Sequence, residues 1–285
     1  MKKNTKITVN DIQSLKNCEQ PFATITAYDY ISATIIETLP VPLVLVGDSA
    51  SMVMYGYSNT IPINMEELLL VTKAVARGLN NTMLIGDMPF MSYQPSKEIA
   101  ILNAGRLIKE GRCDGVKLEG GVEFVHIIKA IVNAGIPVMG HIGLKPQKVL
   151  QNSGYKVSGK TEESAIAIVK DAIALEQAGV FSIVLESIPS KLAGLITKEI
   201  QIPTIGIGAG TMCDGQIQVF HDLLGLYGQL KPKHAKQYIN GEKIIAKAIA
   251  SYCAEVQQGE FPSKRNTYKI DNKLFNQIKQ AIEDI

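Results

Sequence analysis

Acidic side chains recur at the ends of apolar runs in this sequence. Asp48, Asp87, Glu119 and Glu186 each follow or close a short hydrophobic stretch, and Lys117 stands two residues before Glu119. Asp87 follows Asp48 by 39 residues (87−48) and Glu119 follows Asp87 by 32 (119−87), which is about the length of one strand–helix unit with its loops. Because ligands gather at the carboxyl ends of parallel strands, the pattern predicts that these side chains assemble one site.

Carboxylates in this arrangement favour a magnesium site that binds an α-keto acid. Asp48 and Asp87 offer the hard oxygen ligands that Mg²⁺ prefers, and Glu119 is a third candidate ligand, either direct or through water. A bound Mg²⁺ can chelate the ketone and carboxylate oxygens of the keto acid and stabilise the enolate formed when the adjacent carbon loses a proton. Lys117 shares a strand face with Glu119, so we expect its ammonium to meet the substrate carboxylate. Glu186, on another strand, is then the candidate base.

Structural roles for the same residues are the competing interpretation. An acid at a strand end commonly caps the following helix, and Lys117 alone could form an inter-strand salt bridge. His141 has two open interpretations, a donor to the substrate or a partner of a loop carbonyl. The glycine run at 206–210 lacks the spacing and the lysine of a phosphate loop, so a tight turn is preferred there. Three further histidines are expected to be structural: His126, His221 and His234.

Eight apolar segments alternate with helical patterns along the chain. Continuous apolar strands of this kind imply a parallel sheet that is covered on both faces. The leading fold is an α/β chain in a single-domain (β/α)8 TIM barrel, and a doubly wound sheet is the alternative. The expected strands are residues 22–27, 43–47, 82–87, 115–118, 137–141, 182–186 and 204–207, with a weaker one at 217–221.

Local signals place helices between these strands and before the first of them. Asn64 followed by Glu67 forms a capping-box pattern ahead of an apolar stripe at helical spacing. An N-terminal segment with Val9, Ile12 and Leu15 is predicted to be an extra helix that closes the bottom of the barrel.

Composition favours one large enzyme-like domain. The 285 residues are 46% hydrophobic and 20% charged, which suits a single barrel of about 250 residues. The formal net charge of +2 is too small to indicate a nucleic-acid partner. The four cysteines stand far apart without a Cys-x-x-Cys pair, as expected in a reducing cytosol. There is no apolar run of about 18 residues, so neither a signal peptide nor a membrane span is expected.

Six motifs resemble the ketopantoate hydroxymethyltransferase family, and they run in the family's order from about residue 5 to residue 258. The motifs are Thr-Ala-Tyr-Asp at 26–29, Val-Gly-Asp-Ser at 46–49, Gly-Asp-Met-Pro-Phe at 86–90, Val-Lys-Leu-Glu-Gly-Gly at 116–121, His-Ile-Gly-Leu-Lys-Pro-Gln at 141–147, and Pro-Thr-Ile-Gly-Ile-Gly-Ala-Gly at 203–210 followed by Asp-Gly-Gln at 214–216.

The resemblance implies a (β/α)8 barrel that uses Mg²⁺ and 5,10-methylenetetrahydrofolate to hydroxymethylate 3-methyl-2-oxobutanoate, on the route to pantothenate and coenzyme A. By resemblance, Asp48, Asp87 and Glu119 correspond to the metal positions. Glu186 corresponds to the proton acceptor. The family also implies a cytoplasmic homo-oligomer, often a decamer. The positions of the keto-acid site are Asp48, Ser49, Asp87 and Lys117.

The resemblance divides the chain into a catalytic domain at 1–258 and a helical tail at 259–285. In the tail, Leu274, Ile278 and Ile282 repeat every four residues and suggest a helix that docks on the body or on a neighbour. The chain departs from the family at 56–60, where Gly-Tyr-Ser-Asn-Thr stands for the usual Gly-His-Asp-Ser-Thr, and at Ser187, which replaces a frequent cysteine.

The pterin of the folate is expected at the 141–146 loop and the 206–210 turn, where absent side chains let a flat ring approach the backbone. Two other functions are considered. A Mg²⁺-dependent lyase or mutase of the phosphoenolpyruvate and isocitrate-lyase kind would also act on an α-keto acid, but the catalytic cysteine loop expected of it is not found. A catalytically idle barrel kept as a binding or assembly protein is disfavoured by the intact set of acids.

Overall fold

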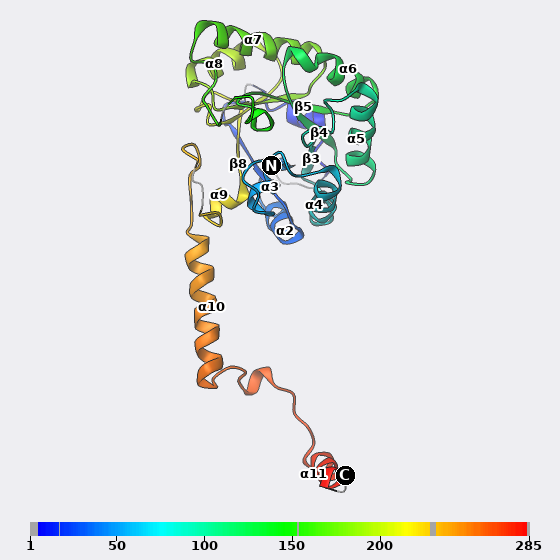
Figure 1. Cartoon of the computed structure of the whole chain (residues 1–285), viewed down its shortest axis with the longest axis vertical. Helices are drawn as coiled ribbons and strands as arrows, with labels where there is room; N and C mark the ends of the chain where they lie inside the picture. The colour runs from blue at the N-terminus through cyan, green and yellow to red at the C-terminus, as the bar shows by residue number, and fades with distance from the viewer. Residues whose placement is uncertain (1–4, 17, 153, 229–231, 284–285) are drawn as a thin grey trace. The chain divides into compact units, whose positions relative to one another are not determined.

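The computed structural model describes residues 5–16, 18–152, 154–228 and 232–283, and a closed ring of eight parallel strands forms the centre of its larger compact unit (Figure 1). Each strand pairs with the next along the chain, and β8 pairs with β1 to close the ring. The (β/α)8 barrel predicted from the sequence is therefore confirmed. The strands are β1 Phe22–Thr26, β2 Leu43–Val46, β3 Met83–Asp87, β4 Gly115–Glu119, β5 Val138–Gly143, β6 Ser182–Glu186, β7 Thr204–Ile207 and β8 Gly215–Gln218.

Helices connect the strands and lie around the outside of the ring (Figure 1). The α-helices of this part of the chain are α1 Val9–Gln13, α2 Tyr30–Glu37, α3 Ala50–Val53, α4 Met65–Gly78, α5 Lys97–Lys109, α6 Val125–Asn133, α7 Glu162–Gln177, α8 Ser190–Glu199 and α9 Phe220–Leu224. Two 3₁₀ turns accompany them, η1 Val122–Phe124 and η2 Pro146–Lys148.

Alternate residues of each strand face the inside of the ring, as the pleat of a strand requires. Met83 and Ile85 of β3 pack in an interior cluster with Met139 of β5 and Val184 of β6. Leu84, between the first two, belongs instead to the layer between strands and helices. At the carboxyl ends of these strands, the residues that face the inside of the ring are polar. These residues are Asp87 on β3, Lys117 and Glu119 on β4, His141 on β5 and Glu186 on β6.

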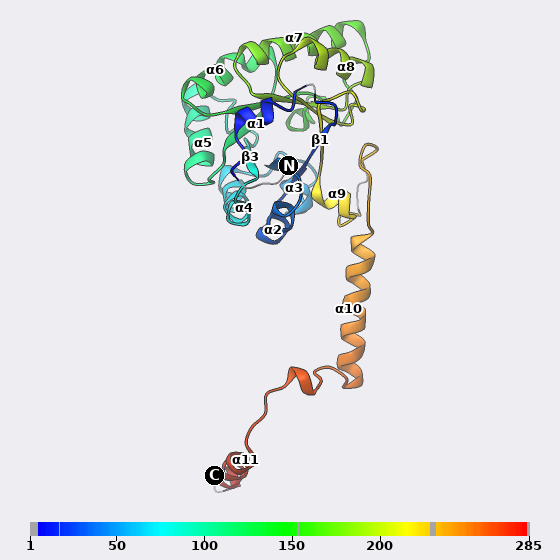
Figure 2. The same cartoon turned by 180° about the vertical axis from the view of Figure 1, so that it is seen from behind.

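The predicted N-terminal helix is present as α1 and closes the other end of the barrel (Figure 2). A capping box between Thr8 and Asp11 starts the helix. Ile12 is fully buried and joins the interior cluster, and Val9 and Leu15 pack against that cluster. The site is thereby restricted to the end where the strands terminate.

The helical signals expected between the strands agree with the structure in α4 and α7. The Asn64 side chain accepts hydrogen bonds from the backbone N–H groups of Glu66 and Glu67, and the Glu67 carboxylate accepts from the Asn64 N–H. In α7, Ile168 and Leu175 are buried at helical spacing.

The eighth strand was predicted at 217–221, and this prediction is wrong in its boundaries. The strand is Gly215–Gln218, and Phe220–Leu224 forms α9. Gly215 pairs with Phe22, and a Cβ atom there would lie 2.7 Å from the Phe22 ring. The strand therefore begins at a glycine that the packing requires and continues through polar Gln216, a composition that does not resemble an apolar run.

The chain divides into two compact units, Met1–Tyr238 and Ile239–Ile285. The second contains α10 Gly241–Gln258, the 3₁₀ turn η3 Lys264–Asn266 and α11 Asn272–Glu283. The domain boundary expected at residue 258 falls at the end of α10 and not at the division between the two units, and it stays a prediction. Among the described residues, none of the helices is both long and apolar enough to cross a membrane.

Candidate active site

The ends of β3 and β4 place a buried ion pair at the centre of the site. Asp87 and Lys117 are register partners on these strands. The Lys117 Nζ donates to both carboxylate oxygens of Asp87 at 2.8 Å, and both side chains are almost fully buried. Asp48, two residues past the end of β2, donates its backbone N–H to Asp87 Oδ2 at 3.1 Å. The two predicted metal ligands are therefore adjacent, and Asp87 is held by both neighbouring segments.

Gln147 connects two of the predicted acids. Its side-chain amide donates to Asp48 Oδ2 at 2.9 Å, and its backbone N–H donates to Glu119 Oε2 at 3.1 Å. The amide also donates to the Met88 carbonyl, while its oxygen accepts from the Tyr93 hydroxyl. Gln147 is 4% exposed, so this network orients the acids from inside the protein.

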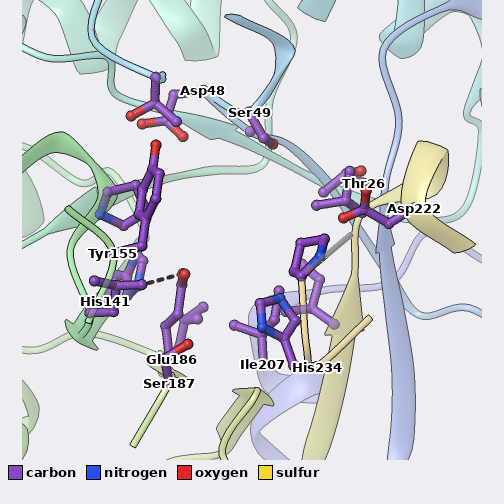
Figure 3. Close-up of a pocket in the computed structure, with 18 of the residues that line it drawn as sticks. Thr26, Asp48, Ser49, His141, Tyr155, Glu186, Ser187, Ile207, Asp222 and His234 are labelled. Atoms are coloured by element: carbon purple, nitrogen blue, oxygen red, sulfur yellow. Dashed lines mark ion pairs between the residues drawn. The ribbon is translucent and has the colours of Figure 1, made fainter. Parts of the chain in front are cut away.

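Glu186 and His141 face each other on β6 and β5. His141 Nε2 lies 3.2 Å from Glu186 Oε2, as the dashed line in Figure 3 marks. His141 Nδ1 lies 3.7 Å from Glu119 Oε1. Among the described residues, neither ring nitrogen nor Glu119 Oε1 has a hydrogen-bond partner. Burial, and next the charge of Lys117, hold the pKa of His141 well below its usual value, so the imidazole is neutral.

Burial also dominates the titration of the acids. It raises the pKa of Glu186 to about 7. Burial and then the charge of Asp87 raise the pKa of Asp48 to about 7. The pKa of Glu119 is raised well above its usual value, with burial again the largest cause. For Lys117, burial acts to lower the pKa, but the charges of Asp87 and Asp48 raise it above the usual value. The ammonium therefore stays charged.

These side chains open into a cavity of about 340 Å³ at the carboxyl ends of the strands (Figure 3). Ser49 lines it, and its Oγ is 2.7 Å from the hydroxyl of the buried Tyr28. The structure brings together all of the predicted site residues on this cavity: Asp48, Ser49, Asp87, Lys117, Glu119, His141 and Glu186.

The donor set fits a Mg²⁺ ion held by few protein ligands. At the strand ends, the carboxyl groups of Asp48, Asp87, Glu119 and Glu186 outnumber the ammonium of Lys117, while Lys156 and Lys233 line the cavity from loops. Among the described residues, Glu119 Oε1 is a buried acceptor without a partner. A divalent cation would offset this excess of negative charge. Within the described ranges, no group of three or more His, Cys, Asp or Glu side chains is arranged to hold a metal. Two carboxylates suffice when water and substrate complete the shell, and Glu119 as a third ligand stays a prediction.

Comparison with known proteins shows the family. A family model described as ketopantoate hydroxymethyltransferase matches residues 6–264. The chain belongs to the ketopantoate hydroxymethyltransferase family. A protein of Dehalococcoides mccartyi strain 195, named 3-methyl-2-oxobutanoate hydroxymethyltransferase, is 49% identical over 97% of this chain and 98% of its own length. One of the same name from Clostridium beijerinckii is 50% identical over 96% of this chain and 99% of its own. The chain is thus an enzyme.

Solved structures of other enzymes share the fold of this ketopantoate hydroxymethyltransferase family member. A phosphonopyruvate hydrolase covers 98% of this chain and 97% of its own, with a TM-score of 0.58 and 12% identity. A phosphoenolpyruvate phosphomutase from Streptomyces platensis subsp. rosaceus covers 97% of each chain, with a TM-score of 0.59 and 11% identity. At this identity the likeness concerns the barrel alone, so it does not favour the lyase or mutase alternative.

Three residues that the sequence interpretation missed also belong to the site of this family member. Gln147 was part of a motif, but no periodic signal marks it as a link between acids. His234 was expected to be structural, yet it lines the cavity. Asp222 lines the cavity from α9, a helix that was not predicted. All three depend on contacts between distant segments, which spacing along the chain does not report.

Two loop residues have backbone roles in this family member. Gly208, expected to approach a pterin, has φ +64, and a Cβ atom there would lie 3.1 Å from His234. A valine at 208 would therefore strain the protein whether or not folate binds nearby. Ser187, directly after Glu186, has φ 48, a strained conformation for a residue with a side chain. Its N–H donates to the Ile207 carbonyl, which fixes the backbone that follows Glu186.

Proposed function

We propose that the chain transfers a hydroxymethyl group from 5,10-methylenetetrahydrofolate to 3-methyl-2-oxobutanoate. One water is consumed, tetrahydrofolate is released, and the product is 2-dehydropantoate, for pantothenate and coenzyme A biosynthesis. The observation that carries the proposal is the position of Glu186 and neutral His141 beside the Asp48, Asp87 and Lys117 group in one cavity. Membership of the family supplies the reaction class.

The metal and the keto acid are assigned to the ends of β2, β3 and β4. Asp48 and Asp87 would hold Mg²⁺, with Glu119 reaching it directly or through water. When bound, Mg²⁺ would withdraw electron density from the ketone and carboxylate of the keto acid and so acidify the C3 proton. Lys117 has one N–H beyond the two given to Asp87, and this donor can meet the substrate carboxylate.

Ser49 supplies a second contact to the keto acid. Its Oγ and the Tyr28 hydroxyl are 2.7 Å apart. If Tyr28 donates to Ser49, the Ser49 proton is free to point into the cavity, toward the substrate carboxylate. Tyr28 is buried, and burial raises the pKa of its hydroxyl, so the group remains protonated and able to donate.

Glu186 is the base in this proposal. A carboxylate with a pKa of about 7 is substantially ionised at neutral pH and is a strong enough base to remove an acidified proton. Neutral His141 lies 3.2 Å from the carboxylate without adding a positive charge that would weaken the base. The proton from C3 passes to Glu186, and the C3 electron pair forms the new bond to the one-carbon unit.

Proton exchange at C3 tests the base without the folate. Wild-type protein with Mg²⁺ and 3-methyl-2-oxobutanoate in D₂O is expected to exchange the C3 proton, observed by NMR. Glu186→Gln should bind the keto acid normally and lose about 10²- to 10⁴-fold in exchange rate. Glu163→Gln, on the exposed face of α7, is the matched control and should exchange like the wild type. Normal exchange in Glu186→Gln, together with its loss in His141→Gln, would assign the base to His141.

The working form is proposed to be a cytosolic homo-oligomer, as the family resemblance implies. Apolar residues follow one another at helical spacing on α10, where Ile245, Ile249, Tyr252 and Val256 are exposed in the single chain. Exposed apolar stripes of this kind are usual at subunit contacts. Light scattering after size exclusion measures the mass of the assembly, and a monomer at micromolar concentration would contradict the proposal.

A further inference from the structure

The keto-acid site uses only part of the cavity. Its residues come from the ends of β2 to β6. Part of the remaining lining comes from the other arc of the ring: Thr26 on β1, Ile207 on β7, Ile217 on β8, and Val219 just beyond β8. In Figure 3, Asp222 and His234 lie across the cavity from Asp48 and His141. A five-carbon keto acid at the strand ends therefore leaves a second space, which is walled largely by apolar side chains.

Asp222 is the acidic group on this side of the cavity, whose described lining also includes Lys233 and His234. It stands on α9, a short helix that follows β8, and it is half-buried. Within the described part of the chain, no N–H or O–H group donates to its carboxylate. Burial alone raises the pKa of Asp222, to about 6, so neither an ion pair nor a hydrogen bond compensates for the lost solvent. A half-buried carboxylate that receives no hydrogen bond from the described protein groups is available to accept one from a bound ligand.

The surroundings of Asp222 define the chemistry of that partner. Ile207, Ile217 and Val219 offer apolar surface on which a flat ring can lie. The carboxylate has two oxygens and accepts two parallel hydrogen bonds when a ligand presents adjacent N–H groups. The reduced pterin of a folate has such a pair, its 2-amino group and its N3–H. Its other end carries the one-carbon unit, which must reach C3 of the keto acid beside Glu186.

We propose that Asp222 binds the 2-amino and N3–H groups of the pterin, with the β7–β8 side of the cavity as the pterin site. The inference rests on the proposed function, because it takes the folate co-substrate as given. It moves the recognition of the pterin from the glycine turn at 206–210 to the segment that follows β8. It also explains why the carboxylate lies apart from the four acids at the strand ends.

Binding measurements test this site without turnover. Tetrahydrofolate is titrated by calorimetry into wild-type protein, Asp222→Asn and the control Glu163→Gln, each with Mg²⁺ and 3-methyl-2-oxobutanoate present. Hydrogen bonds to a charged group predict that Asp222→Asn weakens tetrahydrofolate binding about 10- to 100-fold. Affinity for the keto acid should stay unchanged, which also shows that the variant is folded. Glu163→Gln loses the same charge on an exposed helix face and should bind both ligands like the wild type.

A pterin analogue locates the contact. Tetrahydrofolate with a methyl group in place of the 2-amino group should bind wild-type protein about tenfold more weakly than tetrahydrofolate does. In Asp222→Asn, the analogue and tetrahydrofolate should bind about equally, because the variant has already lost the charged acceptor of the 2-amino group. Asp222→Ser provides a second variant should the asparagine variant fail to fold.

The outcomes separate the two proposals. If wild-type protein binds tetrahydrofolate and Asp222→Asn binds it equally well, the Asp222 assignment is overturned and the proposed function stands. Additive losses from the variant and the analogue also overturn the assignment, because the two groups would then not meet. If wild-type protein binds no tetrahydrofolate, the assignment of folate as the co-substrate is wrong, and the assignment of the pterin site is overturned as well.

Discussion

Two buried acids in the site, Asp48 and Glu186, have pKa values of about 7, against ordinary values of 3.8 and 4.5. Their folded-state pKa lies above the unfolded one, so between about pH 4 and pH 7 the folded protein binds more protons than the unfolded chain. By linkage, stability must then fall as pH rises through this window. Full ionisation above pH 7 leaves repelling charges in a dry site.

Metal-free protein is therefore expected to be less stable at pH 8 than at pH 6. For Glu186 alone the difference is of the order of 1–3 kcal/mol, taking about 1.4 kcal/mol per pKa unit. Urea unfolding at the two pH values measures it. Glu186→Gln should reduce the difference, because the amide does not ionise. Added Mg²⁺ should stabilise the protein more at pH 8 than at pH 6. Equal stabilisation at both pH values would contradict a Mg²⁺ site that is formed by the ionised acids.

Among the elements, β5 and β6 show how closely the backbone confines Glu186. Gly143 ends β5 with φ +95, and its register partner is Glu186 at the end of β6. A Cβ atom on Gly143 would lie 2.3 Å from the Glu186 carbonyl oxygen and 2.8 Å from Ile188 Cγ2. Glycine is required at this position both for its conformation and for space.

Gly143→Ala is expected to destabilise the protein and to displace Glu186. Gly135→Ala is the matched control, since Gly135 has φ +84 but a Cβ atom there would meet nothing within 4 Å. Both variants place an alanine in a left-handed backbone conformation, which should lower the free energy of unfolding by about 1–2 kcal/mol. Gly143→Ala should lose about 1–3 kcal/mol more through the clash, together with C3 exchange. Equal free energies of unfolding in the two variants would show that β5 and β6 relax apart without cost.

How far the sequence predicts the structure also depends on the element. The inward acids on β3, β4 and β6 were predictable because each closes a mainly apolar strand segment, although β4 also carries the inward Lys117. The predicted bounds of β8 were wrong because the strand begins with Gly215 and Gln216, which are not apolar. These residues are in the strand because they pair with β1. Asp222 and Gln147 were missed for a related reason. Their partners or surroundings lie on segments far away in the chain, and only the closed ring brings these segments together.

For the molecule as a whole, residues 259–285 are expected to be dispensable for the barrel. No residue of α11 or η3 is buried. Removing these residues should shift the thermal unfolding midpoint of the barrel by less than about 2 °C, since about 1 kcal/mol corresponds to 2–4 °C at this size. Binding of Mg²⁺ and keto acid should be unchanged in calorimetry.

Assembly is the property on which the truncation should act. Leu274, Phe275, Ile278 and Ile282 form an exposed apolar stripe on α11. Ile278→Glu in the full-length chain keeps the helix but places a charge in the apolar stripe. It should therefore lower the mass of the assembly, as the truncation should. A large loss of barrel stability on truncation would instead mean that the tail packs on its own barrel.

Closure of the ring between β1 and β8 has a consequence for synthesis. Phe22 pairs with Gly215, 193 positions later (215−22). At 5–20 residues per second, the ribosome needs roughly 10–40 s to make the second partner after the first. Throughout that interval the nascent chain carries an open edge on β1, with backbone groups able to pair with another chain. Expression yield should therefore depend on elongation speed and on chaperones that cover this edge, even if the finished enzyme is stable.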